Sequence, residues 1–254
     1  MTFLDLSARP GRGSYASMVR AQTRTELVLT LRRGESVLLT LLIPLGLLVF
    51  FSLVDVLPRG GARGVDFLVP GVLALAVMST AFTGQAIATA FERSYGVLKR
   101  LGATPLPRWA LLAGKTLAVL AVEVLQVALI VAVGYALGWH PHGNPGSVLL
   151  LVVVGTAAFS GLGLLMAGLL RAELTLAAAN GLYLVLLLLG GVVFPAAQLG
   201  ALEGLSRALP TGALSHGLRA VLLTGSGLPG ADLLVLLGWA VALLALAART
   251  FRWE

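Results

Sequence analysis

Polar side chains inside the apolar stretches of this chain are the first candidates for chemistry. Glu123 lies within one such stretch, and Gln126 falls on nearly the same helix face three residues later. Gln85 and Asn180 are amides inside two other stretches. A buried carboxylate is costly, so it faces protein or a water-filled cavity. The four residues either line a pathway or gate or form structural hydrogen bonds between helices. Both interpretations stay open for Glu123, and the structural one is favoured for the amides.

Lys115 is the charged residue nearest to Glu123 in the sequence. It is the natural partner for the carboxylate, but it lies two helical turns earlier, about 12 Å along a helix axis. We therefore expect a distant pairing at best.

The tripeptide Gly-Lys-Thr at 114–116 resembles the end of a phosphate-binding loop. That loop requires a first glycine five positions before the second one and a preceding strand. The position of the first glycine is occupied by Trp109, and Pro105 and Pro107 precede it. We therefore expect that this chain binds no nucleotide.

The histidines give only a weak metal signal. His140 and His142 flank a proline, His216 stands alone, and the chain has no cysteine. No serine, histidine and acid arrangement indicates hydrolysis. We expect no cofactor, no metal site and no catalytic activity of the chain itself. The net charge of +7 does not indicate nucleic-acid binding, because interleaved stacking aromatics are absent.

Composition places these residues in a membrane. The chain has 254 residues, of which 58% are hydrophobic and 11% charged, whereas soluble domains average about 25% charged. A membrane-spanning helix needs about 20 apolar residues, and a helix satisfies its own backbone groups in lipid. We predict an all-α integral membrane protein with six spans, at 37–57, 67–90, 109–137, 148–170, 175–194 and 231–248.

The basic residues predict the orientation of these spans. With both termini in the cytoplasm, the external side keeps four of the 18 basic residues, namely Arg59, Arg63, Arg207 and Arg219. Basic residues concentrate on the cytoplasmic side of membrane proteins, so this topology is favoured.

The leader and the connection between the last two spans both lie outside the six spans. We divide the chain into a cytoplasmic leader, 1–36, and a transmembrane domain, 37–254. From Ser14, a plausible N-cap, the leader predicts an amphipathic helix on the inner membrane surface, although an ordinary solvated lead-in is the alternative. The connection at 195–230 has two short apolar stretches, which fit external re-entrant helices or a partly apolar loop.

The segment at 91–101 is charged but sits between two spans. It begins with Glu92 and Arg93 and ends with Lys99 and Arg100, an order that suits a helix dipole. Pro105 then forces a turn. We expect a stiff cytoplasmic helix that docks a soluble partner; a plain basic loop that only fixes topology is the alternative.

This segment resembles the one after the second span of type 2 ATP-binding cassette (ABC) transporter permeases. The matching positions are Glu92, Arg93, Gly96, Leu98, Leu101, Pro105, Leu106, Gly114 and Lys115. The stretches at 190–195 and 208–225 also resemble that family, although 211–213 has smaller residues than usual. The resemblance implies a coupling helix that contacts an ATP-binding subunit through Glu92, Arg93, Gly96, Leu98, Lys99, Arg100, Leu101 and Pro105.

The resemblance also implies a function. The chain is expected to be the permease subunit of an ATP-driven exporter in the bacterial cell membrane, similar to antibiotic and drug exporters. Its partners are expected to be an ABC ATPase, a second permease copy and lipid, and its substrate a hydrophobic or amphipathic drug or lipid. A polysaccharide exporter shares the plan. An ion-coupled secondary transporter is the remaining alternative, but no inverted repeat supports it.

Overall fold

The computed structural model describes residues 13–32, 34–54, 64–192 and 200–251. Within these residues the chain forms helices and no strands. The elements are α1 Tyr15–Arg32, α2 Gly34–Leu53, α3 Gly64–Val77, the π-helix η1 Met78–Gly84, α4 Gln85–Ser94, α5 Val97–Gly102, α6 Arg108–Ala136, α7 Pro145–Leu169, α8 Ala172–Leu189, α9 Glu203–Ala208, α10 Pro210–Thr224 and α11 Gly230–Thr250.

The all-helical membrane class is confirmed. Five helices are long and apolar enough to cross a membrane: Gly64–Ser94, which runs through α3, η1 and α4, and the helices α6, α7, α8 and α11. They correspond to the second to sixth predicted spans, although residues 193–194 of the fifth lie outside the described residues. The first predicted span corresponds to α2, whose apolar part Thr40–Leu53 is shorter than the other five.

Local sequence explains the sharp start of α7. Its N-cap is Asn144, whose side-chain oxygen accepts a hydrogen bond of 2.8 Å from the backbone N–H of Gly146. Pro145 occupies the first helical position, where the missing N–H has no helical partner to lose. The helix therefore begins at a defined residue.

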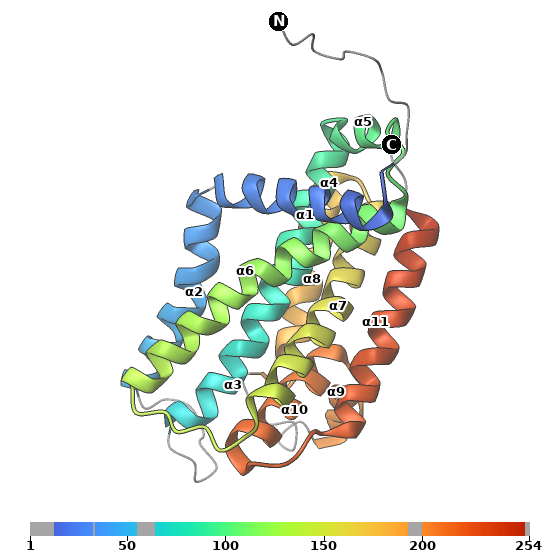
Figure 1. The fold of residues 1–254 in the computed structure, drawn as a ribbon. Helices are drawn as coiled ribbons and strands as arrows, with labels where there is room; N and C mark the ends of the chain where they lie inside the picture. The colour runs from blue at the N-terminus through green and yellow to red at the C-terminus, as the bar shows by residue number, and fades with distance from the viewer. Residues whose placement is uncertain (1–12, 33, 55–63, 193–199, 252–254) are drawn as a thin grey trace, which may run out of the picture.

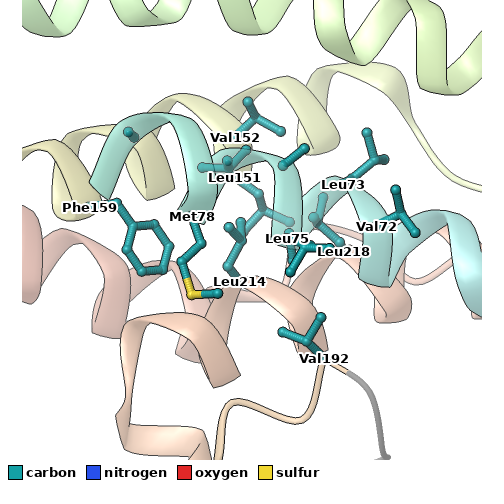
Figure 2. Close-up of a cluster of buried hydrophobic side chains, with 14 of the residues drawn as sticks. Val72, Leu73, Leu75, Met78, Leu151, Val152, Phe159, Val192, Leu214 and Leu218 are labelled. Carbon is teal, nitrogen blue, oxygen red and sulfur yellow. The ribbon is translucent and has the colours of Figure 1, made fainter. Parts of the chain in front are cut away.

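The core lies where α3, η1, α7 and α10 meet. Figure 2 shows part of this core. It includes Leu73 of α3, Met78 of η1, Leu151 of α7 and Leu214 of α10, all of which are fully buried. In lipid, such packing is driven by close van der Waals contact rather than by removal of apolar surface from water. Small residues in α7 allow this close contact.

Gly163 of α7 is the tightest of these contacts against η1. A Cβ atom at this position would lie 2.7 Å from the backbone oxygen of Phe82 and 3.3 Å from that of Ala81. The π-helix has a wider turn than an α-helix, and such turns occur frequently at functional sites. Here the glycine allows the backbones of η1 and α7 to approach closely.

Helix α1 lies across the bundle at the end where α5 is found, and the last turn of α11 ends there too (Figure 1). The rings of Tyr15 and Trp109 are 5.3 Å apart, so α1 packs on the first turn of α6. Most of α1 is exposed, and only Gln22 is buried. This arrangement suits the expected interfacial helix, which stays a prediction because it depends on the position of the lipid.

At the opposite end, the predicted short helices of the connection are present as α9 and α10 (Figure 1). Helix α10 is largely buried, so it is part of the bundle rather than a loose apolar loop. Arg219 donates hydrogen bonds to the backbone oxygens of Gly191 and Val192 and lies 4.3 Å from the centre of the Phe67 ring. One side chain thus ties α10 to α3 and to the end of α8.

Candidate functional site

The segment predicted as one stiff helix over 91–101 is broken in the structure. Helix α4 ends at Ser94, and α5 begins at Val97 after a turn through Tyr95 and Gly96. Gly96 has a φ of 72°, a left-handed conformation that glycine adopts without strain and that commonly ends helices. The prediction of a continuous rod is therefore wrong: the segment is a helix, a glycine turn and a second short helix.

Helix α5 has one anchored side and one exposed side. Leu98 is fully buried against Leu111, Leu164 and Phe251, which come from α6, α7 and the end of α11. Tyr95 is 74% exposed and Val97 40% exposed. The predicted docking residues Lys99, Arg100 and Pro105 are exposed as well, whereas Leu101 is half-buried. The segment therefore presents apolar, aromatic and basic side chains at one end of the bundle while its other side is fixed to the membrane helices.

Arg93 is used inside the molecule. Its guanidinium donates to the backbone oxygens of Gly168, at 2.7 Å, and of Leu170. These carbonyls lie at the C-terminal end of α7, where a cation is favoured by the helix dipole. Arg93 therefore connects α4 to α7.

Glu92 belongs to a buried ion cluster with Lys115 and Glu26. The Lys115 ammonium lies 2.5 Å from a carboxylate oxygen of Glu92 and 2.8 Å from one of Glu26. The lysine side chain is 4% exposed, and the two glutamates are 13% and 14% exposed. Gln22 donates a further hydrogen bond of 2.7 Å to Glu26. The cluster joins α1, α4 and α6, so the expected pairing of Lys115 with Glu123 is wrong.

Sequence reasoning missed Glu26 as a member of this cluster. The available signal was the pair Gln22 and Glu26, which share one face of α1 at a spacing of four residues. Nothing in the sequence showed that this face meets Lys115, 89 positions further along the chain.

The Gly-Lys-Thr tripeptide has a packing role. A Cβ atom on Gly114 would lie 2.7 Å from Cγ of Gln22 and 2.9 Å from its Cβ. The glycine therefore allows α1 to lie directly on α6, and the next residue, Lys115, reaches the ion cluster. Both residues lie within α6, near its start, rather than in a loop around a phosphate.

Two of the predicted polar residues connect helices through hydrogen bonds. Gln126 accepts a bond of 3.1 Å from Thr80 of η1 and donates one of 2.8 Å to the backbone oxygen of Thr40 in α2. Gln85 accepts a bond of 2.9 Å from Ser160 of α7. This favours the structural interpretation for both amides.

Glu123 and Asn180 are not brought together with the other two. Glu123 is 1% exposed and accepts a hydrogen bond from Thr156 of α7. Asn180 is exposed on α8, where its amide donates 2.8 Å to the backbone oxygen of Leu176 one turn earlier. The four predicted residues therefore do not form one lined channel within the described chain.

The geometry predicts that Glu123→Gln is tolerated. The amide has the shape of the carboxyl group, and its oxygen can accept the same bond from Thr156. We expect a free energy of unfolding in detergent within about 0.5 kcal/mol of the wild type. Glu123→Leu should lose about 0.5–1.5 kcal/mol, because the bond between α6 and α7 is removed while the Thr156 hydroxyl keeps the Val152 oxygen as acceptor. Normal stability of Glu123→Gln together with lost transport would instead give the carboxyl a functional role.

The three histidines make separate contacts in the described structure and do not form a common site. His216 pairs with Asp232 at 2.8 Å, linking α10 to α11, a contact that sequence reasoning missed. His142 uses its backbone N–H to bind the backbone oxygen of Leu222. In the part of the chain that the structure describes, no group of three or more His, Cys, Asp or Glu residues could hold a metal ion.

Comparison with known protein families identifies the family of this chain. The family model described as ABC-2 type transporter matches residues 18–223, which extend from α1 almost to the end of α10. The chain belongs to the ABC-2 type transporter family. It is thus a multi-pass membrane protein and the permease subunit of an ABC transporter, which confirms the resemblance seen in the sequence. No curated protein matches the chain.

Proposed function

We propose that this ABC-2 permease is driven by a separate ABC ATPase that contacts the segment from Tyr95 to Pro105. The observation that carries the proposal is the two-sided nature of this segment. Its exposed side chains are chemically suited to a protein surface, and Leu98 fixes it to α6, α7 and α11. The chain then supplies the pathway, and ATP hydrolysis takes place on its partner.

Three contacts support a mechanical role for the same segment. The Gly96 turn joins α5 to α4, which continues through η1 into α3. Glu92 joins α4 to Lys115 of α6, and Arg93 joins it to the end of α7. A displacement of α5 by the ATPase is thus passed to three membrane helices at once.

The proposed orientation places α1, α5 and both termini in the cytoplasm, and α9 and α10 outside a bacterial cell membrane. Most basic residues lie at the proposed cytoplasmic end, as expected for a membrane protein. The proposed direction is export, and the proposed substrate is a hydrophobic or amphipathic drug or lipid.

A second permease copy completes the proposed transporter. Helix α8 exposes a row of large apolar side chains, including Leu184 and Leu188, beside the exposed amide of Asn180. An exposed amide on an apolar face favours contact with protein over contact with lipid tails. We therefore place α8 at the contact between two copies.

The ATPase contact can be tested by copurification. The double variant Tyr95→Ala/Arg100→Glu changes two exposed residues and leaves Leu98, Glu92 and Arg93 in place. We expect at least a tenfold loss of ATPase recovered with the tagged permease, because large aromatic and arginine contacts dominate protein interfaces.

The matched control is Arg24→Glu, an exposed charge reversal on α1. It should retain the ATPase, and both variants should unfold at the wild-type temperature. Undiminished recovery of the ATPase with the double variant would contradict the proposal that this segment contacts the ATPase.

A further inference from the structure

A cavity of about 530 Å³ opens beside the ion cluster, between α1, α2, α4 and α6. Ligand-binding pockets in proteins span about 300–1,000 Å³, so its size suits a small amphiphile. It reaches the surface, because Leu29, Tyr95 and Val97 contribute to its lining and are exposed. It is separate from the anchored side of α5, which faces α6, α7 and α11.

Most of the cavity wall is apolar. Ile87 and Ala88 contribute from α4, and Val119 and Val122 from α6. These residues lie one to two turns deeper along their helices than the ion cluster. The cavity therefore has a charged part near α1 and an apolar part that extends into the bundle.

The charged part has more negative than positive groups. Its charged lining residues are Glu26, Glu92 and Lys115, two carboxylates for one ammonium. Both carboxylates already contact the single lysine, so the lining carries a formal charge of −1. Charges removed from water are stabilised by opposite charge, and an added cation would balance this one.

Two buried polar groups in the wall also lack partners. Gln85 is 6% exposed and Thr89 1% exposed, and both line the cavity. The Gln85 Nε2 and the Thr89 Oγ1 have no hydrogen-bond partner among the described residues. Of the two, only the Thr89 hydroxyl can accept a hydrogen bond from an ammonium group, because the Gln85 amide nitrogen is itself a donor.

We propose that this cavity binds an amphiphile with an ammonium head group and an apolar tail. The head group lies beside the cluster of Glu26, Lys115 and Glu92, whose excess negative charge it balances, and the tail follows the apolar wall of α4 and α6. The same chemistry is present in the head group of phosphatidylethanolamine and in foreign cationic amphiphiles. The inference rests on the proposed function and narrows its substrate class, because an ammonium amphiphile is one kind of amphipathic drug or lipid. Binding itself requires neither the ATPase nor a second copy, so it can be tested separately.

The test uses the purified full-length chain in phosphatidylglycerol nanodiscs without the ATPase. Dodecyltrimethylammonium and dodecyl sulfate have the same tail and opposite charge, and native mass spectrometry measures the binding of each. We expect the cation to bind at least tenfold more tightly than the anion. A second arm replaces part of the lipid with phosphatidylethanolamine and measures lipid retained after detergent extraction.

Two variants test the two parts of the cavity separately. Glu92→Gln removes the excess charge and leaves Lys115 paired with Glu26, so the preference for the cation should fall at least tenfold. Ala88→Phe fills the apolar part without changing charge and should abolish binding of the cation. Glu203→Gln, an exposed carboxylate on α9, is the matched control and should bind as the wild type does.

Retention of phosphatidylethanolamine that is lost in Glu92→Gln would support the inference with the lipid as ligand. Binding of the added cation alone would support it with a foreign amphiphile as ligand. Equal binding of cation and anion, or unchanged binding in both variants, would overturn it. If the amphiphile does not bind as expected but the ATPase copurifies normally, only this inference is contradicted. If the amphiphile binds as expected but the ATPase does not depend on Tyr95 and Arg100, only the proposed ATPase contact is contradicted.

Discussion

Replacement of Lys115 by methionine is expected to destabilise the membrane domain by about 3–5 kcal/mol. The variant leaves the carboxylates of Glu26 and Glu92 close together and largely buried, with their shared ammonium removed. Removal of one partner from a buried ion pair is strongly destabilising because an uncompensated charge remains. The measurement is the midpoint of thermal unfolding in detergent, followed by size-exclusion chromatography.

The control removes the whole cluster. In Glu26→Gln/Glu92→Gln/Lys115→Met no charge remains, and most of the lost stability should return, because replacement of a complete buried ion cluster by uncharged residues is often nearly neutral. A Lys115→Met protein that stays monodisperse and unfolds at the wild-type temperature would show that the cluster does not hold α1, α4 and α6 together.

The second large effect is expected for Gly163→Leu. Any Cβ at this position meets the backbone of η1, with the Phe82 oxygen at 2.7 Å, and a backbone atom cannot move aside as a side chain can. Overpacking of a tight contact costs about 1–3 kcal/mol and occasionally more, and a leucine adds three further carbons. We expect stability to fall by about 3 kcal/mol or more and expression in the membrane to drop.

The matched control for this substitution is Gly238→Leu on α11. Gly238 is exposed, and a Cβ there would have no atom within 4 Å. It should therefore unfold like the wild type. If Gly163→Leu were as stable as Gly238→Leu, the close approach of α7 to η1 would be incorrect.

The fold class could be predicted from the sequence because lipid imposes simple constraints. Long apolar stretches with few charges can only be membrane helices, and this placed five spans close to their observed bounds. The π-helix was not predicted, because an extra residue in a helical turn leaves no change in composition. The stretch from Met78 to Gly84 reads MSTAFTG, a mixture of small, hydroxyl and apolar residues that an ordinary membrane helix can also contain.

The candidate site could be predicted only in part, because its contacts connect distant parts of the chain. Local charge order suggested that 91–101 is a docking segment, but it was consistent with a continuous helix, and Gly96 alone decides the break. Glu92 and Arg93 were assigned to the docking surface because they match the coupling segment of the resembling family. Their actual partners, Lys115 and the end of α7, were not recognisable without the packing of the helices.

The contact between Glu26 and Lys115 has a consequence for biosynthesis. Helix α1 leaves the ribosome before any span, but the ammonium that holds its carboxylate is 89 residues later in the chain. At about 5–20 residues per second, translation of that interval takes about 4–18 s. During this time the nascent α1 lacks its binding surface on α6, so α1 can reach its final position only after α6 has been synthesised.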